Sequence, residues 1–160
     1  MRRMILISAA AFALAGAAHA QAGRQTRHFL KDAMQGDSSE VMLGKLAIAQ
    51  GDSQAMKSYG QMLVDDHSMH LQKVDQLAGS LKVPTDDHPT PAAEKERDKL
   101  MGLHGAAFDR AFARYMAKDH RKMITEFERE AKTPGDVGQM AQQTLPTLHK
   151  HLAGAEKLEG

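Results

Sequence analysis

The sequence contains no cysteine and no tryptophan, and only 4% of its residues are aromatic. The missing cysteine excludes disulfide bonds, cysteine nucleophiles, and zinc or iron–sulfur sites that depend on thiolates. Lys plus Arg (21) nearly balance Asp plus Glu (20), so the formal net charge is +1. This balance argues against a nucleic-acid partner, because proteins that bind nucleic acid carry a basic stripe. The residues left for chemistry are the nine histidines and the carboxylates.

The first twenty residues have the composition of a secretory signal peptide. Arg2 and Arg3 precede an apolar, alanine-rich run of about fifteen residues, and Ala18-His19-Ala20 matches a small-x-small cleavage site. This run is shorter than the roughly 20 residues of a membrane-spanning helix, and no other run approaches that length. We therefore expect cleavage after Ala20, with residues 21–160 forming a mature domain that is periplasmic or secreted and has no transmembrane segment. Cleavage removes two arginines and no acid, which changes the formal charge to −1.

Strand-forming residues are scarce after residue 20, where the chain has two Ile and five Val. Helix formers dominate instead. The spacing of apolar residues, with Gly and Pro at the breaks, predicts long helices over about 25–50, 53–81, 104–132 and 134–158, and a short one at 94–101. The intervening linker, 82–93, holds three of the five prolines. This pattern predicts an all-α, ferritin-like four-helix bundle with one long connection between the second and third helices, in either an up-and-down or a crossover topology.

One ionisable residue of each long helix lies on its apolar stripe, and the four are Glu40, His67, His120 and His151. Counted from the nearest turn, they lie roughly 18, 22, 21 and 26 Å along their helices, so they meet near mid-height in either topology. Buried imidazole and carboxylate groups need partners. Three imidazoles and one carboxylate suit zinc, iron or copper. We therefore predict that these four side chains are metal ligands.

A second interpretation of these four residues needs no metal. They would form a hydrogen-bonded polar layer that fixes the register of the helices.

Two further groups of residues each have two interpretations. His67 and His70 are spaced i, i+3. Either the two histidines share one metal ion, or one of them is buried and the other is exposed. Met116 and Met123 are either soft copper(I) ligands or ordinary core residues.

Two of the predicted ligands follow an aspartate directly, in Asp66-His67 and Asp119-His120. Adjacent residues point about 100° apart around a helix, so each aspartate is badly placed to hold its own histidine. We expect each carboxylate to reach a neighbouring helix instead. Asp109 lies three helical turns before His120, and we interpret it as a capping or structural residue.

Four segments of the chain resemble a known family in their order and spacing: Glu40-Val-Met-Leu-Gly-Lys-Leu-Ala47, Met62-Leu-Val-Asp-Asp-His67, Met116-Ala-Lys-Asp-His120 and Leu145-Pro-Thr-Leu-His-Lys-His151. Over about residues 25–158 the sequence resembles the bacterial domain-of-unknown-function 4142 family. The resemblance implies an exported protein with a ferritin-like helical bundle. It also implies that Glu40, His67, His120 and His151 occupy recurrent polar positions of the family. It implies no established activity.

Two functions of different classes fit these observations. The first is a periplasmic bundle that binds a metal ion through its Glu/His layer, for metal handling or stress protection. The second is a non-enzymatic structural or interaction bundle of the cell envelope, whose Glu/His layer only fixes packing. No catalytic residue is predicted, because the sequence has neither a Gly-x-Ser-x-Gly elbow nor a Gly-rich phosphate loop. The partners to consider are a metal ion and further copies of the chain in a homo-oligomer.

Overall fold

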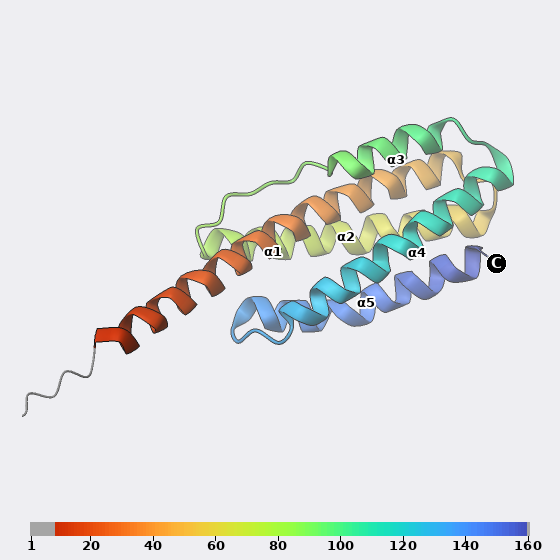
Figure 1. The fold of residues 1–160 in the computed structure, drawn as a ribbon. Helices are drawn as coiled ribbons and strands as arrows, with labels where there is room; N and C mark the ends of the chain where they lie inside the picture. The colour runs from red at the N-terminus through yellow and green to blue at the C-terminus, as the bar shows by residue number, and fades with distance from the viewer. Residues whose placement is uncertain (1–8, 160) are drawn as a thin grey trace, which may run out of the picture.

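A computed structural model describes the backbone of residues 9–159 and the side chains of residues 23–159, and this part of the chain is all-α (Figure 1). The helices are α1 (Ala9–Gln50), α2 (Gln54–Ser80), α3 (Pro91–Met101), α4 (Gly105–Glu130) and α5 (Asp136–Glu159). The all-α prediction is confirmed. The described chain has five helices rather than four, because the segment after the linker forms a complete helix of 11 residues. Residues 1–8 of the predicted signal peptide lie outside the described residues.

The start of α2 is fixed by two side chains. Ser53 is the N-cap, and its hydroxyl oxygen accepts a hydrogen bond of 3.1 Å from the backbone N–H of Met56. From α4, the carboxylate of Asp109 accepts from the backbone N–H groups of Asp52 and Ser53, both at 2.9 Å. Helix N-termini leave backbone donors unpaired, and these contacts satisfy them. Asp109 is therefore a capping residue, although the helix it caps is α2 and not its own.

The starts of α3 and α5 differ from the predicted ones for local reasons. Thr90 caps α3, and Pro91 occupies the first turn, where its missing N–H costs nothing. This helix therefore begins three residues earlier than predicted. At the other site, Gly135 has a positive φ of 99°, which interrupts the backbone directly after Pro134. For this reason α5 begins at Asp136.

The four long helices pack side by side, and the main contacts among them join antiparallel pairs (Figure 1). The contacts pair α1 with α2, α2 with α5, α5 with α4, and α4 with α1. The linker after α2 and helix α3 carry the chain back along the outside of α1, so α2 and α4 run in the same direction (Figure 1). The structure thus has the crossover topology, one of the two that the sequence left open. Among the described helices, none combines the length and apolarity that crossing a membrane requires.

The hydrophobic core consists of two clusters on either side of a polar layer. Along α1, Leu30 and Met34 belong to one cluster and Leu43 to the other, with Asp37 and Glu40 buried between them. Helices α2, α4 and α5 show the same sequence of apolar, polar and apolar residues. In these three helices the buried polar residues of the layer are His67, His120 and His151. Burying apolar side chains on both sides drives the helices together and keeps bulk water away from the layer.

Helices α1 and α2 approach closely where two glycines face each other. A Cβ atom added to Gly60 would lie 2.7 Å from the carbonyl oxygen of Gly44 and 2.9 Å from the Cβ of Ala47. A Cβ added to Gly44 would lie 2.8 Å from the carbonyl oxygen of Gly60. Because the obstructing atoms are backbone, the contact cannot open without separating the helices. The two glycines therefore set the distance across which α1 and α2 present their polar side chains.

Replacing Gly60 with alanine is expected to lower the free energy of unfolding by about 1–3 kcal/mol, the usual cost of overpacking. Urea unfolding followed by circular dichroism measures this change. Gly79 lies in the same helix, and a Cβ added there meets nothing within 4 Å. Gly79→Ala is the matched control and should be neutral or stabilising by up to about 1 kcal/mol, because alanine favours the helix. Equal stability of the two variants would contradict the close-packing interpretation.

Candidate metal centre

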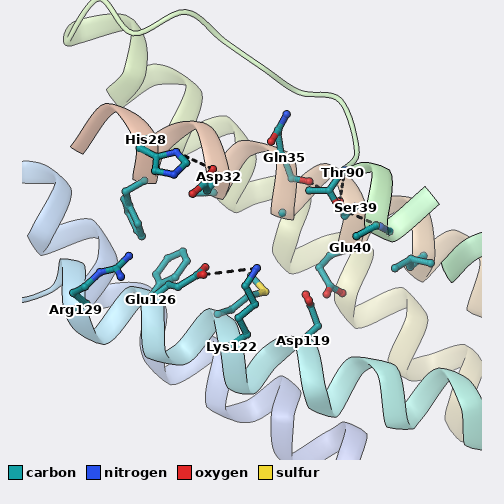
Figure 2. Close-up of a pocket in the computed structure, with 18 of the residues that line it drawn as sticks. His28, Asp32, Gln35, Ser39, Glu40, Thr90, Asp119, Lys122, Glu126 and Arg129 are labelled. Atoms are coloured by element: carbon teal, nitrogen blue, oxygen red, sulfur yellow. Dashed lines mark hydrogen bonds and ion pairs between the residues drawn. The ribbon is translucent and has the colours of Figure 1, made fainter. Parts of the chain in front are cut away.

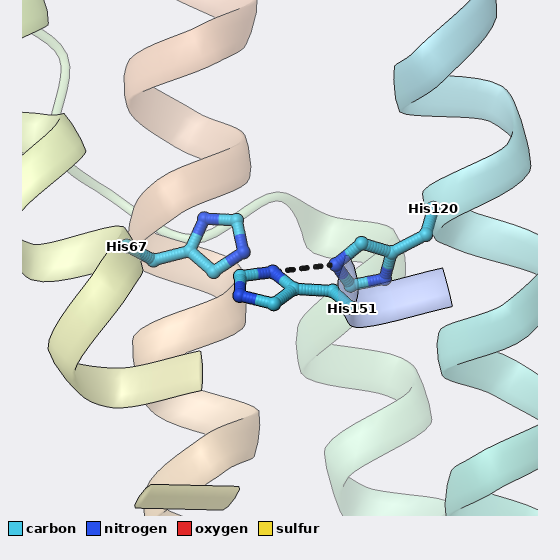
Figure 3. A group of neighbouring side chains, drawn as sticks. All are labelled: His67, His120 and His151. Atoms are coloured by element: carbon cyan, nitrogen blue, oxygen red, sulfur yellow. Dashed lines mark hydrogen bonds between the residues drawn. The ribbon is translucent and has the colours of Figure 1, made fainter. Parts of the chain in front are cut away.

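Three buried histidines from three different helices meet in the polar layer (Figure 3). His67 comes from α2, His120 from α4 and His151 from α5, and their exposed fractions are 3%, 0% and 0%. The ring centroids are 5.9 Å apart for His67 and His120, 5.1 Å for His67 and His151, and 5.3 Å for His120 and His151. One nitrogen of each ring lies within 4.8 Å of the corresponding nitrogens of the other two. This spacing would allow a single metal ion to contact all three rings.

Each histidine is held from behind by an oxygen atom. The Nδ1 atom of His67 lies 2.8 Å from Oδ1 of Asp37, on α1. The Nδ1 atom of His120 lies 3.0 Å from the backbone carbonyl oxygen of Met116. The Nε2 atom of His151 lies 2.9 Å from Oδ2 of Asp66, on α2. Metal-binding histidines are typically held in this way, with the second nitrogen bonded to a carboxylate or carbonyl oxygen that orients the ring.

These oxygen partners determine which nitrogen of each neutral ring carries the hydrogen. A carbonyl or carboxylate oxygen only accepts, so His67 and His120 donate from Nδ1 and His151 donates from Nε2. The nitrogens on the opposite side of the rings from these oxygens are Nε2 of His67, Nε2 of His120 and Nδ1 of His151. The last two atoms face each other at 3.3 Å, and Nε2 of His67 is buried without a hydrogen-bond partner among the described residues. The three nitrogens that face away from the oxygen partners therefore converge on one place.

The surroundings keep two of the three rings neutral. Burial and the neighbouring His67 and His151 together lower the pKa of His120 to about 3. The hydrogen bond to the carbonyl oxygen of Met116 opposes this shift only in part. Burial also lowers the pKa of His151 to about 4, although the hydrogen bond to Asp66 opposes this shift. Only a neutral imidazole has a lone pair available for a metal. Both rings are therefore in the metal-binding form at neutral pH.

Asp37 joins the histidine cluster to a fourth histidine. Its carboxylate accepts from Nδ1 of His67 at 2.8 Å and from Nδ1 of His70 at 2.7 Å. Burial alone would raise the pKa of Asp37, but the hydrogen bonds from the two histidines outweigh it and lower the pKa. The other nitrogen of His70 lies 3.0 Å from the hydroxyl of Thr144 and 3.3 Å from the sulfur of Met140. His67 and His70 thus share a carboxylate, and their remaining nitrogens point to different surroundings.

The structure places Glu40 outside the group formed by the three histidines. Glu40 is 1% exposed, as the stripe on α1 predicts, but Figure 2 shows that it points toward Asp119 on α4. Burial raises the pKa of Glu40 well above its ordinary value, and the negative charges of Asp119 and Asp37 raise it further. Burial also raises the pKa of Asp119. The predicted set of four is therefore divided into a histidine cluster and a pair of facing carboxyl groups.

The aspartates beside the histidines behave as the helical geometry predicts. Asp66 reaches His151 on α5, and Asp119 reaches toward Glu40 on α1, so neither holds the histidine that follows it. The side chains of Met116 and Met123 belong to the two apolar clusters on opposite sides of the layer. Asp37 is a residue of the candidate site that the sequence analysis did not identify. Its position three residues before Glu40, on the same face of α1, is the signal that could have identified it.

The fold and the site together define a class: an all-α protein in which three helices of a crossover bundle each contribute one histidine to a buried cluster. The chain belongs to the DUF4142 family of domains of unknown function, whose family model matches residues 11–158. It is also similar to a crystal structure of a DUF305 fragment from Deinococcus radiodurans. The TM-score is 0.76 at 16% identity, over 85% of this chain and 95% of that one. At this identity the similarity shows the fold alone. A comparison with curated proteins finds no match.

Proposed function

We propose that the protein binds one transition-metal ion through His67, His120 and His151. The observation that carries the proposal is the convergence of three imidazole nitrogens, one from each ring, with each ring fixed by a hydrogen bond on its opposite side. In a layer that serves only for packing, the facing nitrogens of His120 and His151 would be expected to form a donor–acceptor pair. Here their oxygen partners leave an acceptor opposite an acceptor. A metal ion satisfies both.

The spacing of the cluster also suits a metal. Zinc binds histidine nitrogens at about 2.0–2.1 Å in tetrahedral geometry, which puts two such nitrogens about 3.4 Å apart. The facing nitrogens of His120 and His151 are 3.3 Å apart. Imidazole sets of this kind accept zinc, iron or copper, and the metal bound in the cell depends on availability as well as affinity. The carboxylates of Asp37 and Asp66 would offset part of the charge of the ion.

The setting of this site is also a proposal. We propose that the domain is a ferritin-like four-helix bundle with α3 inserted in its crossover, a fold that commonly holds metals between facing helices. It is supported by the antiparallel neighbours and by the parallel run of α2 and α4. We further propose that the signal peptide directs the protein to the periplasm, where it serves in metal handling or stress protection.

The test is to purify the protein from the periplasmic fraction and measure its metal content by mass spectrometry. We expect close to one equivalent of a transition metal per chain and an N-terminal residue of Gln21. After treatment with a chelator, adding zinc should raise the melting temperature by several degrees, because a ligand that binds only the folded state stabilises it. No bound metal, together with no thermal shift from zinc, copper, iron or manganese, would instead support a layer that only fixes packing.

A further inference from the structure

A second polar site lies between α1 and α4, beside the histidine cluster and not part of it. Glu40 and Asp119 line a cavity of about 530 Å³, and Figure 2 shows their carboxyl groups directed toward each other. The mouth of the cavity is lined by exposed polar side chains, including His28, Asp32 and Lys122. None of the three histidines of the cluster lines this cavity.

Glu40 has an unusual environment for a buried acid. Both of its carboxyl oxygens are buried, and among the residues that the structure describes only the carboxyl group of Asp119 is placed to share a hydrogen bond with them. Within the same part of the chain, the ion pairs of the lysines include none with Glu40 or Asp119. The nearby Lys122 instead lies 3.7 Å from Glu126. A buried polar group without a partner is costly, and a buried charge without one costs still more. The cavity next to Glu40 is where the missing partner would be bound.

The chemistry of the two acids indicates the kind of partner. Carboxylate oxygens are preferred ligands of hard divalent cations, which complete their coordination with water. Two carboxyl groups contributed by facing helices to the lining of one cavity provide such a set. The histidine cluster offers nitrogen donors and is suited to different metals. The two sites therefore select different ions. They are adjacent, because α4 contributes Asp119 to the carboxylate site and the next residue, His120, to the histidine cluster.

We propose that Glu40 and Asp119 form a second cation site, which binds a divalent metal through oxygen ligands in the cavity between α1 and α4. This site does not depend on metal binding by the three histidines. It assigns Glu40 to a role with Asp119 and not to the histidine set. Manganese(II) is a suitable probe, because its preference for oxygen ligands matches the two carboxylates and its free aqueous form has a distinctive electron paramagnetic resonance signal.

The experiment is to titrate the chelator-treated full chain with manganese(II) and follow the loss of the free-ion signal. The unaltered protein should bind about one equivalent at this site, and both Glu40→Gln and Asp119→Asn should weaken binding at least tenfold. Glu126→Gln is the matched control, because Glu126 lines the same cavity and is paired with Lys122. That variant should bind as the unaltered protein does. His151→Ala should also retain manganese binding, which separates this site from the histidine cluster.

The proposal is overturned if the unaltered protein binds no manganese at millimolar concentration, or if Glu40→Gln and Asp119→Asn bind it as tightly as Glu126→Gln. In either case the two carboxyl groups share only a proton. Loss of manganese binding in His151→Ala with retention in Glu40→Gln would also overturn it, since the ion would then sit among the histidines. If Glu40→Gln does not fold, Asp119→Asn decides the outcome, because Asp119 is only partly buried.

Discussion

Replacing His67 with alanine is expected to lower the affinity for zinc by more than about 100-fold. Changing a group that merely orients a ligand typically costs 10–100-fold, so the loss of a ligand should cost more. His67 is the most informative of the three histidines, because its Nε2 atom is buried without a partner among the described residues and has no evident use other than binding an ion. Competition with a chromophoric chelator at neutral pH measures the affinity of the metal-free protein.

The matched control for this variant is His149→Ala. His149 lies two residues before His151 on α5, but its side chain is exposed, so removing it should leave zinc affinity unchanged. His67→Gln guards against loss of folding, since an amide can still donate to Asp37 while offering no imidazole nitrogen. A stably folded His67→Gln that binds zinc as tightly as His149→Ala does would show that the cluster is not the metal site.

The helical period was sufficient to predict which histidines are buried. His67, His120 and His151 each lie three or four residues from apolar neighbours on one face of a long helix, and all three are buried. The rise per residue then placed them at a common height. The helical period and the rise per residue together predict that the three histidines meet. Antiparallel helices joined by a short turn bring residues that are equally far from the turn to the same level of the bundle. The same reasoning predicted the burial of Glu40.

The direction in which Glu40 points could not be obtained in this way. Glu40 and Asp37 lie one turn apart on α1, and both face the interior between α2 and α4. Which of them meets the histidines depends on how α1 is rotated against its neighbours. That rotation is set by tertiary contacts such as the approach of Gly44 to Gly60. In the structure Asp37 faces His67 and Glu40 faces Asp119.

Asp37 was missed for a further reason. It lies in the run Gly36-Asp37-Ser38-Ser39, whose residues compete with the helix by bonding to the backbone, so the sequence indicates a weak point in α1. The helix nevertheless continues through this run to Gln50. Ser39 bonds within the helix, since its hydroxyl donates to the carbonyl oxygen of Gln35 at 2.7 Å. Tertiary packing thus outweighs local helix propensity at the helical turn that contains Asp37.

The carboxylates explain why the site needs the whole bundle. Asp37 on α1 orients His67 on α2, and Asp66 on α2 orients His151 on α5. Burial alone would raise the pKa of Asp66, but the hydrogen bonds from His151 and Lys150 lower it, so it stays ionised and only accepts. The choice of which nitrogen binds a metal is therefore made by a neighbouring helix for His67 and His151. Only His120 is oriented by its own helix, through the carbonyl oxygen of Met116.

Two buried histidines, His120 and His151, are expected to cost the metal-free protein about 4 kcal/mol of stability between pH 6.5 and pH 4.5, and the raised pKa of Glu40 offsets part of this loss. His120 and His151 have folded-state pKa values of about 3 and about 4. The unfolded chain takes up these protons near pH 6.5. Below that pH the unfolded state binds more protons, so acid destabilises the fold through both histidines. Glu40 acts in the opposite direction, because its raised pKa lets the folded state keep a proton that the unfolded state releases.

Urea unfolding at several pH values, with a chelator present, measures this dependence. His120→Leu removes one of the two titrating histidines and should make the loss of stability with acid shallower. Glu40→Gln removes the opposing group, so it should stabilise the metal-free protein at neutral pH and make the loss steeper. The two variants thus change the dependence of stability on pH in opposite directions, which distinguishes the histidine cluster from the pair of carboxyl groups. A stability that does not vary between pH 6.5 and pH 4.5 in all three proteins would show that the layer is not buried in solution as it is in the structure.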